Sequence, residues 1–261
     1  MEITEWATRI LSADTLEEKL FAPPKLTDSQ PGPSIFWHTP TRPIGMEFKR
    51  HTKEERLPSL HEHGCKDKRA ICLHRFAGHE LLAVEIMAYA LLAFPYAPNY
   101  FRKGLANTLQ EEQEHVRLYI KRLAELGVQF GDLPLYKHFW SHTPYLQTPI
   151  KYISVMSLTF EMANLDFAPM YRNSFAKYGD AESACLMQKI LEDEISHVSF
   201  GYQWLKKFKS SEESEWDAWR GNVPELLPLQ RARGLTLQEE PRKKALIPDA
   251  WIKALHHTAE S

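Results

Sequence analysis

Two Glu-x-x-His sequences, Glu112 with His115 and Glu194 with His197, are the residues of this chain best suited to chemistry. On an α-helix, residues three apart lie about 60° apart around the axis, so each Glu and its His point to the same side. Each pair can therefore bind one metal ion. Two-metal sites in the core of helical bundles use two such pairs and one more carboxylate from each of two other helices.

Two further carboxylates, Glu80 and Glu161, lie in apolar helical runs and precede the Glu of each pair by 32 and 33 residues. Both should face inward, where an unpaired charge is very costly. Four carboxylates carry four negative charges, which two divalent cations balance while the imidazoles stay neutral. The sequence therefore predicts a dinuclear metal site with the following ligands: Glu80, Glu112, His115, Glu161, Glu194 and His197.

The spacing of these residues indicates a duplicated unit. The two halves are offset by 81 or 82 residues, and aligning them on the ligands places Glu85 opposite Asp166 and Glu111 opposite Asp193. A hairpin of two helices thus occurs twice, which predicts pseudo-twofold symmetry about the site.

Glu85 is a rival to Glu80, because it also lies among apolar residues. Five residues correspond to about 140° of rotation, so both cannot face one metal pair from a straight helix. The repeat favours Glu80 as the ligand, and assigns Glu85 and Asp166 to polar contacts around the ligands or between helices. A plainer interpretation stays open, in which Glu80 and Glu161 are structural acids paired with His or Arg.

The elements that must position these residues are long helices. Pro95 and Pro98 should end a helix over about 68–94, and Leu126-Gly127 should end a second that begins near residue 99. A third should begin at Pro149 and a fourth near Asp180, running to about Lys209. We therefore expect a proline-rich arm over 1–67, a helical bundle over 68–209 and an extension over 210–261 that packs on the bundle.

Residues 68–209, with their order E…ExxH…E…ExxH, resemble the ferritin-like superfamily of diiron carboxylate proteins. The stretches RFAGHELLAVEIMAYALLAFP, TLQEEQEHVRLYIKRLAELG and PRKKALIPDAWIKAL are similar to a ferritin-like family of unknown function, and a tRNA-modifying diiron hydroxylase is a more distant relative. The resemblance implies an all-α, ferritin-like four-helix bundle with a long crossover between the second and third helices. In many diiron oxygenases an acid just before the Glu of each ExxH hydrogen-bonds the opposite His, which implies that role for Glu111 and Asp193.

The resemblance also implies a chemistry. Carboxylate and imidazole ligands suit two Fe ions, or Mn, and the leading hypothesis is a centre that activates O2 to oxidise or hydroxylate an organic substrate with electrons from a donor. Alternatives are iron storage, which requires a hollow shell rather than a monomer or homodimer, and peroxide removal at a dimanganese site. Three aromatics are candidates for redox roles near the centre: Tyr89, Tyr119 and Trp204.

Composition limits the partners and the cellular location that can be expected. A net charge of −2 and a pI near 6.6 give no general reason to expect nucleic acid or an anionic membrane as a partner. Glu85 interrupts the longest apolar run, so no membrane span is expected. The three cysteines cannot all pair within the chain, which favours a reducing cytoplasm.

A loose group of His and Cys residues precedes the first long helix and continues into it. The group lacks the short paired spacings of structural zinc sites, so a solvated loop is the favoured interpretation. Its members are His61, His63, Cys65, Cys72 and His74.

Overall fold

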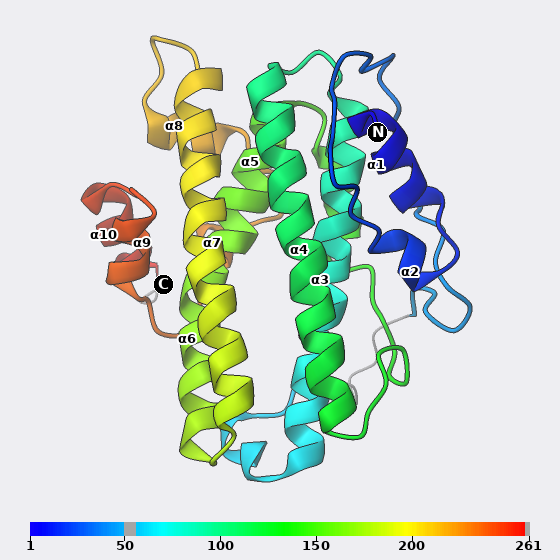
Figure 1. The fold of residues 1–261 in the computed structure, drawn as a ribbon. Coiled ribbons are helices and arrows are strands. Elements are labelled where there is room, and N and C mark those ends of the chain that lie inside the picture. The colour runs from blue at the N-terminus through cyan, green and yellow to red at the C-terminus, as the bar shows by residue number, and fades with distance from the viewer. Residues whose placement is uncertain (50–55, 259–261) are drawn as a thin grey trace. The chain divides into compact units, whose positions relative to one another are not determined.

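Two long helices, α3 (Lys66–Ala93) and α4 (Asn99–Glu125), form an antiparallel hairpin in the computed structural model, which describes residues 1–49 and 56–258 (Figure 1). The chain leaves α3 at Phe94, just before Pro95, and α4 begins directly after Pro98. Gly127 follows α4 in the left-handed region at φ +81°, a conformation that favours glycine at a helix end. The helix bounds lie close to those predicted from the prolines and glycine.

The N-terminal arm contains helices that the prolines alone did not indicate. Helix α1 (Ile3–Ser12) packs on α3 and buries Trp6, Ile10 and Leu11, which recur at helical spacing. Helix α2 (Leu16–Lys19) is one short turn, capped by the Thr15 side chain. Two 3-10 helices, Leu60–Gly64 and Trp140–Tyr145, flank the hairpin in the chain, and Met1–Pro144 form one compact unit.

The second compact unit, Tyr145–Ser261, contains the second hairpin. Helix α5 (Pro149–Val155) starts at a Thr148 cap with Pro149 in its first turn. It leads through a π-helical segment, Met156–Glu161, into α6 (Met162–Lys177), which pairs with α7 (Ala181–Phe208) (Figure 1). The third expected helix is therefore interrupted by a π-helical segment that ends at Glu161, and it continues as α-helix through Pro169.

The C-terminal extension adds small helices to this second unit. They are α8 (Glu215–Gly221), a 3-10 turn (Leu229–Ala232), α9 (Glu239–Lys244) and α10 (Asp249–His257). The rings of Trp219 in α8 and Trp251 in α10 stack with their centroids 4.6 Å apart. The extension therefore has an aromatic core of its own.

Helix α3 combines great length with an apolar composition. It is long and apolar enough to cross a membrane by length and composition alone, with a mean hydropathy of 1.4 over an 18-residue window. However, 89% of that window is buried by protein, as expected for the core helix of a soluble protein. The buried side chains of α3 are accounted for by packing.

Within residues 1–49 and 56–258 the helices are joined by loops, and the only β pairing consists of the isolated bridges Glu2–Thr27 and Phe48–Leu135. The all-α class is thereby confirmed. The ferritin-like four-helix bundle and the division into arm, bundle and extension stay predictions.

Candidate metal centre

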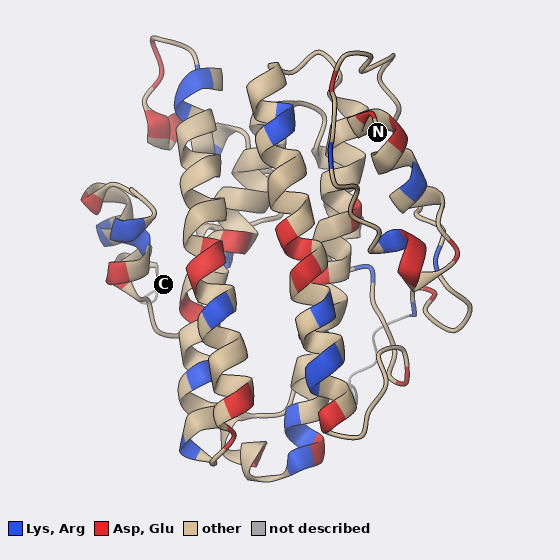
Figure 2. Ribbon diagram, viewed as in Figure 1, with Lys and Arg blue, Asp and Glu red and all other residues tan. Residues whose placement is uncertain are grey.

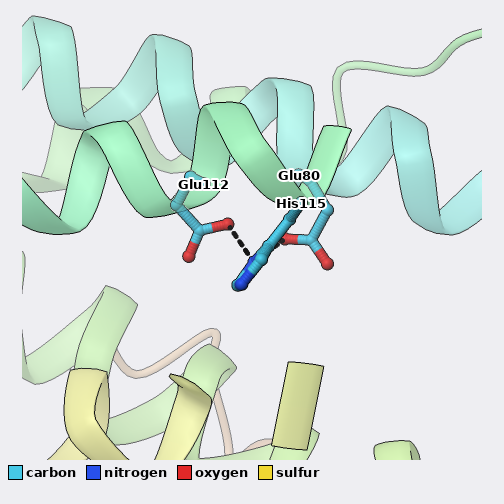
Figure 3. Close-up of side chains that lie close together, drawn as sticks. All are labelled: Glu80, Glu112 and His115. Carbon is cyan, nitrogen blue, oxygen red and sulfur yellow. Dashed lines mark hydrogen bonds and ion pairs between the residues drawn. The ribbon is translucent and has the colours of Figure 1, made fainter. Parts of the chain in front are cut away.

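In the first unit, Glu80 of α3 and Glu112 and His115 of α4 converge on one point (Figure 3). One ligand atom from each lies within 4.8 Å of the others, and the side chains are buried. The Nδ1 atom of His115 lies 3.3 Å from Glu112 Oε2 and 4.0 Å from Glu80 Oε2. Three of the six predicted ligands are therefore assembled within one helical hairpin.

The burial of this cluster sets its electrostatics. Glu80 is 7% exposed, and Glu112 and His115 are each 1% exposed. Figure 2 marks the acidic positions of the chain in red, and other acids of α4 are exposed. Two carboxylates held together away from water must take up a proton or gain a compensating positive charge. A divalent cation bound by two carboxylate oxygens and the imidazole Nδ1 would supply it, and this set of donors suits Fe(II) or Mn(II).

One helical turn from the ligands, the same hairpin presents aromatic rings. Phe76 precedes Glu80 by four residues and Tyr119 follows His115 by four, and their ring centroids lie 6.3 Å apart. Tyr119 is buried. A pair of aromatic rings thus lies one helical turn from the ligands on the same hairpin.

The second unit contains the matching Glu and His of α7. Glu194 and His197 are 1% and 2% exposed, with Glu194 Oε2 3.9 Å from His197 Nδ1. The amide of Asn164, on α6, donates a hydrogen bond of 2.9 Å to Glu194 Oε1 and so fixes the orientation of that carboxylate. Asn164 was not predicted, and its position three residues after Glu161 is the only sequence signal for it.

Glu161 is also buried, at the last position of the π-helical segment. Within the described part of the second unit, it does not join Glu194 and His197 in a three-ligand cluster of the kind that Glu80 completes in the first unit. The two halves of the predicted ligand set therefore differ at their first carboxylate, and the difference coincides with the π-helical segment.

Glu85 and Asp166, which the repeat aligns, both bind cations from outside their hairpins. Glu85 lies 2.9 Å from Lys19 Nζ and 2.5 Å from Arg42 Nη2, both in the N-terminal arm. Burial lowers the pKa of Lys19, and the neighbouring Glu85 carboxylate opposes that shift. Asp166 accepts hydrogen bonds from Arg242 and from the amides of Gly234 and Gln238 in the C-terminal extension. Both acids therefore anchor a terminal segment to a long helix.

The acids that precede each ExxH glutamate lie nearer the surface. Asp193 forms an ion pair with Lys189 one turn earlier on α7, and Glu111 is exposed. A hydrogen bond from either to a ligand histidine stays a prediction.

The loose His and Cys group does not form a cluster of three metal ligands among the described residues. His63 Nε2 lies 3.5 Å from the buried Cys72 Sγ, and burial raises the pKa of Cys72 to about 12. His74 accepts hydrogen bonds from the Gly131 and Leu133 amides. The three cysteines form no disulfide.

Residues 3–253 match the family described as "Protein of unknown function (DUF455)". No match was found among the curated proteins or the solved structures.

Proposed function

This chain belongs to the DUF455 family, and we propose that it is a dinuclear metal protein, with iron as the leading metal, that activates O2 to oxidise an organic substrate. The observation that carries the proposal is the buried convergence of Glu80, Glu112 and His115 within ligand distance of one another. The repeat of the Glu-x-x-His pair supports the second metal, because Glu194 and His197 are buried in the same way on α7.

The proposal includes an arrangement of the helices. The α3–α4 and α6–α7 hairpins would pack as a ferritin-like four-helix bundle with both ligand sets facing its core. The equal offset of the ligands in the two halves supports it, as does the burial of all six ligand side chains.

The residues present fit two divalent ions by charge and donor type. Four carboxylates balance four positive charges, and the two imidazoles bind as neutral ligands. Asn164 would hold the Glu194 carboxylate in place by its 2.9 Å hydrogen bond, and the Phe76–Tyr119 contact would exclude water beside the first triad. When bound, a pair of iron ions would supply the reduction of O2 that the oxidation of an organic substrate requires.

The test is an anaerobic titration of metal-free protein with Fe(II), read by elemental analysis after removal of unbound ion. We expect two ions per chain in the wild type. Glu112→Gln and Glu194→Gln should each lose bound metal. Their matched controls, Glu114→Gln and Glu192→Gln, change exposed acids two residues away on the same helices and should bind as the wild type does.

Mixing the iron-loaded protein with O2 then separates the functions. Consumption of O2 by a monomer or dimer supports the oxidase or oxygenase. A large shell in size exclusion would instead indicate iron storage, and turnover of hydrogen peroxide by a manganese-loaded protein would indicate peroxide removal. A wild type that binds neither metal would contradict the proposal.

A further inference from the structure

The π-helical segment Met156–Glu161 is the least regular part of the long helices, and it ends on a proposed metal ligand. The amide of Met162 donates to the carbonyl of Ser157, five residues earlier, whereas an α-helix uses four. All six residues of the segment are buried. Single turns of π-helix are rare and need support from their surroundings, which are frequently functional sites.

The support comes from two side chains that donate to one carbonyl. The oxygen of Ser154, in the last turn of α5, accepts hydrogen bonds from Thr159 Oγ1 at 2.8 Å and from Trp219 Nε1 at 3.2 Å. A carbonyl oxygen has two lone pairs, so these donors occupy the acceptor that a regular α-helix would offer to the amide of Leu158. The two side chains therefore favour the π-helical register over the α-helical one.

Trp219 makes this support dependent on the C-terminal extension. The residue lies in α8 and is fully buried, with its ring stacked on Trp251 and in edge contact with Trp216 at 5.2 Å. A buried indole N–H needs an acceptor, and here the acceptor is Ser154 O. The aromatic core of the extension is thus connected by a hydrogen bond to the last turn of α5, which leads directly into the π-helical segment.

Helix α7 packs closely against the π-helical segment. A Cβ atom on Gly201, one turn after His197, would lie 2.3 Å from Ser157 Cβ, so only glycine allows α7 to approach this closely. The helix that carries two proposed ligands therefore packs on the segment that carries a third.

We propose that Trp219 is a positioning residue for Glu161: its indole N–H holds the π-helical register and so sets the place of the Glu161 carboxylate. A change from the π-helical to the α-helical hydrogen-bond register would rotate Glu161 by about 100° about the helix axis. Such a rotation would move the Glu161 carboxylate to another side of the helix. The inference rests on the proposed function, because it takes Glu161 as a metal ligand.

The test compares Trp219→Phe with Trp216→Phe. Both variants keep an aromatic ring in the same cluster and lose similar volume, but only the first removes the donor to Ser154 O. In the full-length protein, we expect Trp219→Phe to weaken the binding of one of two Fe(II) ions by about tenfold or more, as loss of an orienting contact typically does. Trp216→Phe should bind both ions as the wild type does.

A second readout uses metal-free protein. Hydrogen–deuterium exchange over residues 154–162 should be faster in Trp219→Phe than in Trp216→Phe. Should Trp219→Phe prove insoluble, Thr159→Val removes the other donor to the same carbonyl with little change of shape and should give the same two effects.

The outcomes separate the two hypotheses. A wild type that binds two ions, with Trp219→Phe equal to Trp216→Phe in affinity and exchange, would overturn the positioning role and leave the metal centre intact. A wild type without metal binding would overturn the proposed function and the role of Trp219 toward Glu161 with it. Faster exchange without a change in affinity would also overturn the positioning role, since the register would then not govern the ligand.

Discussion

Arg242 donates to both carboxylate oxygens of Asp166, at 2.5 Å to Oδ1 and 2.9 Å to Oδ2, and the two side chains are almost completely shielded from solvent. Arg242 also donates to the carbonyls of Met162 and Ala232. Through one guanidinium, α9 is thus attached to the start of α6 and to the 3-10 turn of the extension.

Removal of this guanidinium should be strongly destabilising. Arg242→Met leaves Asp166 buried without its counter-charge, which typically costs about 3–5 kcal/mol. We expect the free energy of unfolding, measured by urea denaturation, to fall by that order. Lys243→Met, at the next position and exposed to solvent in an ion pair with Glu239, is the control and should leave stability almost unchanged. Equal effects of the two changes would contradict the anchoring role.

Glycine at position 201 should be required by packing on α7. Alanine favours helix over glycine by roughly 1 kcal/mol, so Gly201→Ala would stabilise a helix in open surroundings. Here the added Cβ meets Ser157 Cβ at 2.3 Å, and we expect a net loss of about 1–3 kcal/mol in the free energy of unfolding.

A double variant tests the cause of that loss. Ser157→Gly removes the atom that the new Cβ would meet, so the combination with Gly201→Ala should cost less than the sum of the single changes. Additive losses in thermal or urea unfolding would mean that the close approach is not what requires glycine.

His74 should make stability depend on pH. Its Nε2 atom accepts amide hydrogen bonds of 2.9 Å from Gly131 and 3.3 Å from Leu133, so it must be unprotonated, and burial lowers its pKa to about 4. The unfolded chain takes up this proton near pH 6.5, before the folded chain does. The contribution of His74 is therefore complete above pH 6.5 and is lost as the pH falls toward 4, by about 3 kcal/mol.

The measurement is urea unfolding of the wild type and His74→Gln between pH 4 and 7. The stability difference between the two proteins should shrink or change sign toward low pH, because only the wild type loses this contribution. His38→Gln replaces an exposed histidine of the same unit and serves as the control. If the free energy of unfolding depended on pH in the same way in the wild type and in His74→Gln, the predicted contribution of His74 would be ruled out.

Metal should stabilise the fold through the ligand triad. A ligand at about 100 times its dissociation constant adds about 2.7 kcal/mol to the free energy of unfolding. A chelator should therefore lower the melting temperature of the metal-loaded wild type by more than that of Glu112→Gln. Glu114→Gln should respond to the chelator as the wild type does. A wild-type melting temperature that is unchanged by both metal and chelator would argue against the site.

The sequence by itself determined the all-α class, the bounds of the long helices and the convergence of the first triad. Local rules suffice for these features. Proline and glycine favour helix ends through local backbone geometry, as at Pro95 and Gly127, and a Glu and His three residues apart share a helix face in any fold. Glu80 joined them because its spacing in the repeat, and not its neighbours alone, distinguished it from Glu85.

The tertiary structure alone decided how the remaining polar residues are used. Glu85 binds Arg42 and Asp166 binds Arg242 across 43 and 76 residues of chain, and no periodicity within one helix records such a partner. The π-helical register likewise depends on Trp219, 65 residues after the carbonyl that it binds. Helix propensity is a sum of local terms, whereas these hydrogen bonds become favourable only when distant segments meet in a buried site, where an unmatched donor or charge would be costly.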